Sequence, residues 1–139
     1  MFRKIVLAVD GSQHSDLAAD YAAELTEVFQ STLLVVHAYP QTSDLLGYPD
    51  FGNLVARRKS AGQTVLDKVR ARLEKRGVAF QEDLLEGPEA EAILAAADAH
   101  EADLVVMGTR GLGTMKGMLF GSVSRKVSQH AHCPVMLIR

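Results

Sequence analysis

Short, unbroken apolar runs alternate along the chain with longer segments in which apolar residues recur every three or four positions. The runs cover residues 5–9, 33–36, 104–107 and 135–138. Runs of this length and composition are typical of strands that are buried on both faces of a parallel sheet. A further strand is predicted where Val78 and Phe80 alternate with polar neighbours, a pattern that favours a more exposed strand at the edge of the sheet.

The segments between the strands predict four helices. The first is expected over residues 17–29, with Ser12 or Ser15 as its N-cap. The second is expected over residues 53–76, and the third starts at Gly87–Pro88, since proline is favoured in a first turn. The last is expected over residues 122–131. The residues predicted to face the core are Leu17, Ala18, Tyr21, Ala22, Leu25, Val28 and Phe29 in the first helix, Val55, Val65, Leu66, Val69 and Leu73 in the second, and Ala90, Ile93, Leu94 and Ala97 in the third.

Strands that alternate with helices predict an α/β fold, an open parallel sheet with right-handed crossovers and helices on both faces. At 139 residues the chain is expected to form a single domain, residues 1–139. Residues 39–52 contain Pro40, Gly47 and Pro49 and are predicted to form a loop, long enough to be functional or mobile. In such sheets, ligands bind outside the carboxyl ends of the strands, where the strand order reverses.

Composition narrows the possible partners. The net charge is −2 and the calculated pI is about 6.2, which does not favour general nucleic-acid binding. The sequence lacks an apolar run long enough for a transmembrane helix, and the apolar run at the N-terminus ends at Asp10, too early for a signal peptide. The single cysteine excludes an internal disulfide, so a reducing, cytoplasmic location is expected.

A glycine-rich segment follows the apolar run 104–107. Its glycines, Gly108, Gly111, Gly113, Gly117 and Gly121, precede the predicted helix that opens at Ser122. Residues 104–139 contain five Lys and Arg but no Asp or Glu, whereas the rest of the chain has ten basic and seventeen acidic residues. Glycines allow close approach of backbone N–H groups, and a helix N-terminus carries about half a positive charge. The segment therefore predicts a site for a phosphate or another polyanion, although such glycines can also serve only to turn the chain.

The spacing of Gly108, Gly111 and Gly121-Ser122 resembles the nucleotide signature of the universal stress protein family. The resemblance extends over nearly the whole chain, through KIVLAVDGS, LLVVHAY, VVMGTRG and GSVSRKVSQHAHCPVMLIR, in the expected order. It implies a Rossmann-like sheet with strand order 3-2-1-4-5. It also implies the ATP-binding branch of the family, a regulatory or signalling role in stress, and ATP with Mg²⁺ that is hydrolysed slowly or not at all.

The resemblance also implies particular contacts. Nucleotide contacts are expected at Gly108, Arg110, Gly111, Gly121, Ser122, Val123 and Ser124, and at the backbone of Ala8 and Val9. Ala38 and Met107 are expected to meet the adenine. Many family members have a larger apolar residue where this chain has Ala38.

Two residues have alternative interpretations. Asp10 either begins an Asx-turn with Gly11 or contacts the nucleotide or a phosphate-bound Mg²⁺. Ser122 is either only a helix N-cap or also a phosphate ligand. The cluster His130, His132 and Cys133 has zinc-ligand chemistry, but three ligands within four residues is not the usual spacing, and we expect no metal there.

Competing functions remain open: an ATP-hydrolysing or nucleotidyl-transferring enzyme of related fold, or a ligand-free dimeric interaction module. The sequence contains no GK[ST] phosphate loop, and the glycines follow a late strand rather than the first one, which disfavours a dinucleotide site.

The run Val135–Ile138 lies at the end of the chain, and the implied strand order places it at a sheet edge. An uncharged edge strand favours pairing with another copy, so a homodimer is expected; the alternative is a monomer in which a loop covers this edge.

Overall fold

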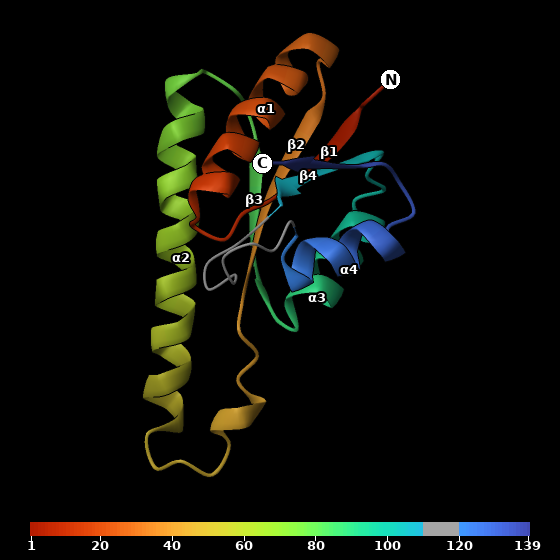
Figure 1. The fold of residues 1–139 in the computed structure, drawn as a ribbon. Coiled ribbons are helices and arrows are strands. Elements are labelled where there is room, and N and C mark those ends of the chain that lie inside the picture. The colour runs from red at the N-terminus through yellow and green to blue at the C-terminus, as the bar shows by residue number, and fades with distance from the viewer. Residues whose placement is uncertain (110–119) are drawn as a thin grey trace.

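Strands and helices alternate along the chain in the order that the apolar pattern predicts (Figure 1). The computed structural model describes residues 1–109 and 120–139. The elements are β1 (Lys4–Ala8), α1 (Gln13–Phe29), β2 (Thr32–Tyr39), the short 3-10 helix η1 (Ser43–Leu45), α2 (Phe51–Lys75), β3 (Gln81–Glu86), α3 (Glu89–Ala99), β4 (Leu104–Gly108), α4 (Ser122–His130) and β5 (Val135–Ile138).

All neighbouring strands of the sheet run parallel, in the order β3-β2-β1-β4-β5. The predicted order is therefore confirmed. The chain leaves β1 toward β2 and β3 and then returns to β4 on the other side of β1. The strand order thus reverses between β1 and β4, and the carboxyl ends of these two strands, at Ala8 and Gly108, lie side by side.

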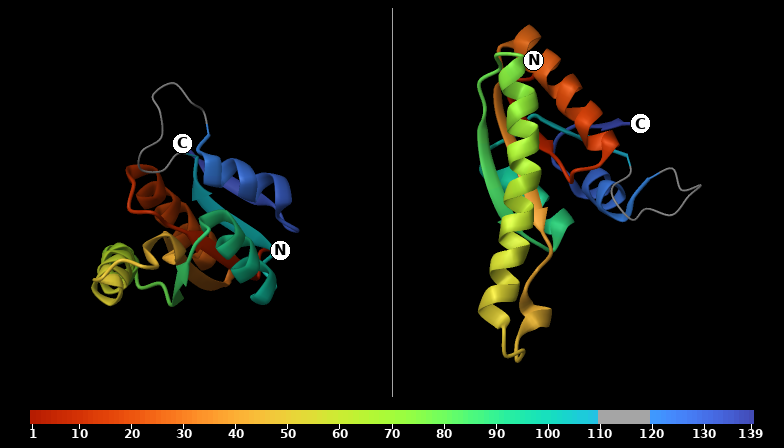
Figure 2. Two further views of the ribbon diagram at one scale, coloured as in Figure 1. Left: turned by 90° about the horizontal axis from the view of Figure 1, so that it is seen from below. Right: turned by 90° about the vertical axis from the view of Figure 1, so that its left-hand side faces the viewer.

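Alternate residues of the central strands face two separate cores, one on each side of the sheet. Figure 2 shows helices on both sides of the sheet. Ile5 and Leu7 pack with residues of α1 and α2, whereas Val6 and Ala8 pack with residues of α3 and α4. Both faces of the sheet are thus covered, which explains why these strands are uninterrupted apolar runs. The helices on both faces confirm the predicted architecture.

Helix α1 packs on the sheet through small side chains. Ala18, Ala19, Ala22 and Ala23 are buried, as are Ser15 and Thr26. The prediction was confirmed for Ala18 and Ala22, and Leu25 packs half-buried against the core, but it was wrong for Leu17, Tyr21, Val28 and Phe29, which are exposed. The alanines allow the helix to approach the sheet closely, so the larger side chains lie outside the contact. Ser12 is the N-cap, accepting a hydrogen bond from the Ser15 N–H.

The third strand is an edge strand, as predicted, but it lies at Gln81–Glu86 rather than around residues 78–80. Val78 is buried in the core beneath α1 and α2, and Phe80 packs against the same core. These two residues close the end of that core before the strand begins. The strand itself is rich in charged residues because its side chains are only partly covered.

Strand β2 continues three residues past the apolar run from which it was predicted, so the following loop is shorter than expected and contains η1. Arg58 of α2 holds this loop through bonds to the Gln41 carbonyl and the Asp44 carboxylate. Tyr39 and Thr42 both donate hydrogen bonds to Glu86 at the end of β3. Burial, followed by the charge of Glu86, raises the pKa of Tyr39.

The long helix α2 confirms the second predicted helix. Leu66, Val69 and Leu73 are buried, whereas Val55 and Val65 are half-buried. In the ranges that the structure describes, no helix is long and apolar enough to cross a membrane.

Candidate functional site

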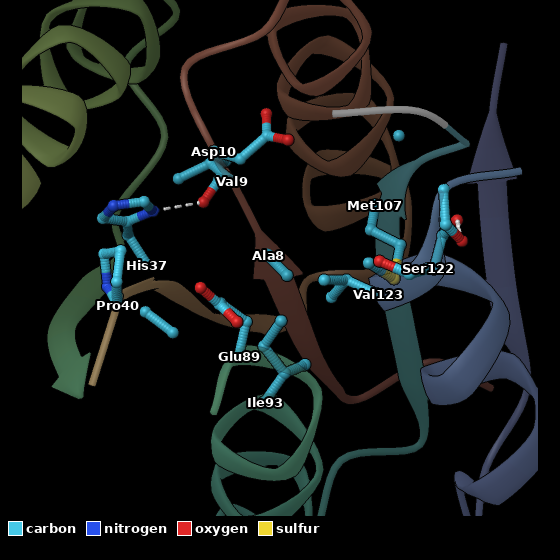
Figure 3. Close-up of a pocket in the computed structure, with 14 residues that line it drawn as sticks. Ala8, Val9, Asp10, His37, Pro40, Glu89, Ile93, Met107, Ser122 and Val123 are labelled. Carbon is cyan, nitrogen blue, oxygen red and sulfur yellow. Dashed lines mark hydrogen bonds between the residues drawn. The ribbon is translucent and has the colours of Figure 1, made fainter. Parts of the chain in front are cut away.

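A cavity of about 450 Å³ opens at the carboxyl ends of β1, β2 and β4 (Figure 3). The first turns of α3 and α4 form its other walls. Its lining residues are Ala8, Val9, Asp10, His37, Ala38, Pro40, Glu89, Ile93, Met107, Gly108, Gly121, Ser122, Val123 and Ser124. It lies where the strand order reverses, the position that open parallel sheets use for ligands.

The cavity brings together all the predicted contact residues that the structure describes. These are Ala8, Val9, Asp10, Ala38, Met107, Gly108, Gly121, Ser122, Val123 and Ser124. Two further predicted contacts, Arg110 and Gly111, lie outside the described residues. Segments that are distant in sequence thus meet at one place.

Four lining residues were not predicted: His37, Pro40, Glu89 and Ile93. His37 and Pro40 lie at and just beyond the end of β2, while Glu89 and Ile93 lie one turn apart on α3. A signal for Glu89 existed, because it follows the Gly87–Pro88 helix start. Because the third strand was predicted around residues 78–80, Glu89 was not expected near the carboxyl ends of the strands.

The N-terminus of α4 faces the cavity with backbone amides that have no acceptor within the helix. Gly121 is the N-cap, so Ser122 is the first helical residue and the N-cap interpretation of Ser122 is wrong. The intrahelical ladder begins with the bond from the Arg125 N–H to the Gly121 carbonyl. The amides of the three preceding residues therefore lack an intrahelical acceptor, and such a helix end attracts anions.

The start of α4 is fixed by bonds to the residue that follows β4. The Gly121 N–H donates to the Thr109 carbonyl at 2.6 Å, and the buried Ser124 hydroxyl donates to the same carbonyl at 2.7 Å. The Ser124 hydroxyl also lies 3.1 Å from the Gly121 carbonyl. These bonds place the helix N-terminus beside the end of β4, and they give the Ser124 side chain a structural role.

Gly108 is required by close packing between β4 and α1. A Cβ atom at this position would lie 2.7 Å from Cβ of His14 and 2.9 Å from its carbonyl carbon. Both distances are too short for carbon atoms, and His14 belongs to the first turn of α1. The absence of a side chain at Gly108 therefore allows α1 to pack closely against the sheet.

Asp10 forms the predicted turn and still lines the cavity. Its Oδ1 accepts a hydrogen bond of 2.9 Å from the Ser12 N–H, which is the Asx-turn geometry. The bond orients the carboxylate at the end of β1, as Figure 3 shows. A carboxylate has acceptor capacity beyond one such bond, so the turn and a second role are compatible.

Charge is distributed unevenly between the two helix N-termini at the cavity. The first turn of α3 carries Glu89 and Glu91, whereas that of α4 carries no acidic residue. Lys126 of α4 forms an ion pair with Glu91, which ties the two helices together and lowers the pKa of Glu91. The α4 side of the cavity is therefore the side suited to an anion.

The histidines and the cysteine near the C-terminus differ in their burial. His130 and His132 are exposed, while Cys133 is half-buried against the core between the sheet, α3 and α4. Burial, followed by the charges of Asp103 and Asp98, raises the pKa of the Cys133 thiol. Within residues 1–109 and 120–139, no three His, Cys, Asp or Glu residues are grouped so that they could hold a metal ion.

Comparison with known proteins gives consistent results. The model of the universal stress protein family matches residues 1–139. A universal stress protein from Thermus aquaticus is 45% identical over 141 residues, which cover 100% of both chains.

Solved structures agree with this assignment. The universal stress protein from Archaeoglobus fulgidus, solved in complex with dAMP, is 25% identical with a TM-score of 0.71, covering 100% of this chain and 98% of that one. A universal stress protein solved in complex with cAMP is 26% identical with a TM-score of 0.77, covering 99% and 97% of the two chains. The chain therefore belongs to the universal stress protein family.

Proposed function

We propose that this chain binds ATP and acts as a regulatory or signalling protein in a stress response. The triphosphate contacts the segment 108–124, and the adenine lies at the opposite end of the cavity, near Ala38 and Met107. One observation carries the proposal: the N-terminus of α4, whose N-cap Gly121 provides no capping side chain, opens into a cavity at the point where the strand order reverses.

Related proteins support the ligand class. Two structures of this family at 25% and 26% identity were solved with dAMP and cAMP, so adenine nucleotides bind to this fold in relatives. The chemistry of the cavity here agrees. Apolar side chains line the end at β2, as a flat base requires, whereas backbone amides and Ser122 line the end at α4, as a phosphate requires.

The test is direct identification of the ligand. Protein purified without added nucleotide is denatured, and the released small molecules are identified by mass; calorimetry with ATP, AMP and cAMP then ranks their affinities. We expect an adenine nucleotide in the released fraction and the tightest binding for ATP. Absence of binding by all three nucleotides would overturn the proposal, and steady release of ADP from ATP would favour the enzyme alternative.

The resemblance also implies Mg²⁺, and Asp10 fits that ion. Mg²⁺ in nucleotide sites is usually held by one or two carboxylates together with phosphate oxygens. The Asp10 carboxylate is oriented by its bond to the Ser12 N–H and lines the cavity. We propose that Asp10 helps to hold a phosphate-bound Mg²⁺, which would neutralise part of the phosphate charge.

A substitution at Asp10 can distinguish the effect of its charge from its role in the turn. Asp10→Asn retains an oxygen for the Ser12 N–H but removes the negative charge. We expect it to weaken ATP binding about tenfold in Mg²⁺, which corresponds to about 1.4 kcal/mol, and to have little effect in EDTA. Calorimetry under both conditions measures this, and Asp83→Ala, at an exposed position of β3, is the control. Equal losses with and without Mg²⁺ would assign Asp10 to the turn or to the ribose.

We further propose a homodimer paired through β5. The strand lies at the edge of the sheet, and Val135, Met136 and Leu137 are only half-buried. Helix α1, which contacts β5, adds exposed apolar surface at Leu17, Tyr21 and Val28. A second copy would cover these surfaces.

A further inference from the structure

The cavity has an acidic side chain that the proposed function does not use. Glu89 is the first residue of α3, and its side chain extends into the cavity beside Ala8 (Figure 3). We infer that the Glu89 carboxylate accepts a hydrogen bond from the exocyclic amino group of the base and thereby selects a 6-aminopurine over a 6-oxopurine. This inference rests on the proposed function, because it assumes that a purine nucleotide occupies the cavity.

The geometry of the sheet places Glu89 at the base end of the cavity. The cavity spans the carboxyl ends of three adjacent strands, β2, β1 and β4. Neighbouring strands are about 4.8 Å apart, so β2 and β4 are separated by roughly 10 Å, which is about the distance from a purine to its first phosphates. With the phosphates at the α4 N-terminus beside β4, the base lies toward β2 and α3. Figure 3 shows Glu89 and Ser122 on opposite sides of Ala8.

The walls at this end are mostly apolar. Ala38, Pro40 and Ile93 contribute no side-chain hydrogen-bonding group. His37 is the other polar residue here, and its Nδ1 lies 2.7 Å from the Val9 carbonyl. Because a carbonyl only accepts, Nδ1 carries the hydrogen and is committed to the backbone.

The Glu89 carboxylate is available for a ligand. It is half-buried, and among the described residues none forms a hydrogen bond or an ion pair with it. Its neighbour on the same helix, Glu91, points elsewhere and pairs with Lys126. Glu89 is therefore the acidic group of α3 that a bound base would meet.

The chemistry of a carboxylate determines which base it favours. An ionised carboxylate has acceptors and no donors. Adenine presents an amino group at position 6, which donates. Hypoxanthine and guanine present a carbonyl oxygen at the same position, which would face the negative charge and leave a partly buried carboxylate unpaired. Guanine also has hydrogen-bond donors on the adjacent edge of its ring, which could bond to the carboxylate, so GTP is the most demanding competitor of ATP in a test of selectivity.

The experiment measures nucleotide selectivity in three proteins. Wild type, Glu89→Gln and the control Glu91→Gln are titrated calorimetrically with ATP, ITP and GTP at fixed Mg²⁺. The control removes the same charge from the same helix at a residue that does not line the cavity. Ratios of affinities are compared, because removing one negative charge shifts the affinity for all three triphosphates in the same direction. Thermal unfolding verifies that each variant is folded.

We expect wild type to bind ATP about thirtyfold more tightly than ITP, the scale of one hydrogen bond to a charged group. In Glu89→Gln the ratio should fall to within about threefold, because an amide can accept from an amino group or donate to a carbonyl. Glu91→Gln should keep the wild-type ratio.

Three outcomes would overturn the inference. An unchanged ratio in Glu89→Gln, with ATP still bound by wild type, would refute the role of Glu89 and leave the proposed function intact. Tighter binding of GTP or ITP than of ATP by wild type would refute selection of a 6-amino group. Failure of wild type to bind any of the three would refute the proposed function together with this inference.

Discussion

Replacing Gly121 by valine is expected to weaken ATP binding at least about a hundredfold, or roughly 2.8 kcal/mol, while the protein remains folded. Gly121 is the N-cap of α4 and lines the cavity. Its backbone angles, φ −75° and ψ 165°, are extended and open to any residue, so the position does not require glycine for the backbone. A branched side chain there would instead occupy space beside the amides of α4 and keep the phosphates away from them.

Calorimetry with ATP measures this loss, and thermal unfolding shows that the fold survives. The matched control is Gly52→Val in the first turn of α2. A Cβ atom at Gly52 would have no neighbour within 4 Å, the residue is exposed, and it does not line the cavity. ATP binding by Gly121→Val at the wild-type affinity would show that the triphosphate lies elsewhere.

The buried elements of the fold could be predicted because their pattern is set by burial itself. Strands β1 and β4 are covered on both faces, so every residue after Lys4 in β1 and every residue of β4 is apolar, and both runs are visible in the sequence. The edge strand β3 was misplaced for the same reason. Its sequence, QEDLLE, reflects partial exposure, and the nearby apolar residues Val78 and Phe80 belong to the connection that closes the core.

The inward face of α1 could not be predicted from the sequence pattern for a different reason. Apolar residues cover more than one side of this helix, so helical periodicity alone does not select the side that packs on the sheet. The choice depends on how closely β4 and α1 approach, and Gly108 permits an approach that only the alanine side can match. The sequence held this information in two distant segments, and only the structure connects them.

Most of the candidate site could be predicted because the glycine segment and the end of β1 carry local signals. The strand order that brings them together came from the family resemblance and not from the apolar pattern. His37 was missed although its neighbour Ala38 was predicted, because an isolated histidine carries no local signal for a site. Glu89 was missed because it becomes part of the site only when β3 ends at Glu86 and α3 begins at the carboxyl edge of the sheet.

The exposed side of β5 presents backbone groups that a second copy can bond. The Pro134 carbonyl accepts from the Val105 N–H, and the Ile138 carbonyl accepts from the Thr109 N–H. Since alternate residues of a parallel strand bond to the same neighbour, the amides of Val135 and Leu137 face away from β4. An antiparallel pair of β5 strands about a two-fold axis would satisfy these groups in both copies.

Side chains of α1, which packs beside β5, also favour contact with a second copy. Asp16, Asp20 and Glu27 lie on the flank of α1 that faces α2, where they form ion pairs with Lys68, Arg72 and Arg76. The same helix exposes Leu17, Tyr21 and Val28, with 44%, 52% and 68% of each residue accessible. Because α1 contacts β4 and β5 while α2 contacts β2 and β3, these exposed apolar residues belong to the helix that lies nearer to β5.

Leu137→Pro is therefore expected to convert the dimer to monomers without disturbing the sheet. Proline removes the outward N–H of residue 137 and leaves the bonds between β5 and β4 in place, as edge strands tolerate. Leu137→Lys should act in the same direction by placing a charge in the paired strand, and both should weaken dimerisation at least about a hundredfold, or roughly 2.8 kcal/mol.

Leu46→Lys, at an exposed leucine far from β5, is the control and should remain dimeric. Sedimentation at micromolar concentration measures each species, with thermal unfolding as the test of folding. A wild-type protein that sediments as a monomer, or a folded Leu137→Pro variant that remains a dimer, would exclude pairing through β5.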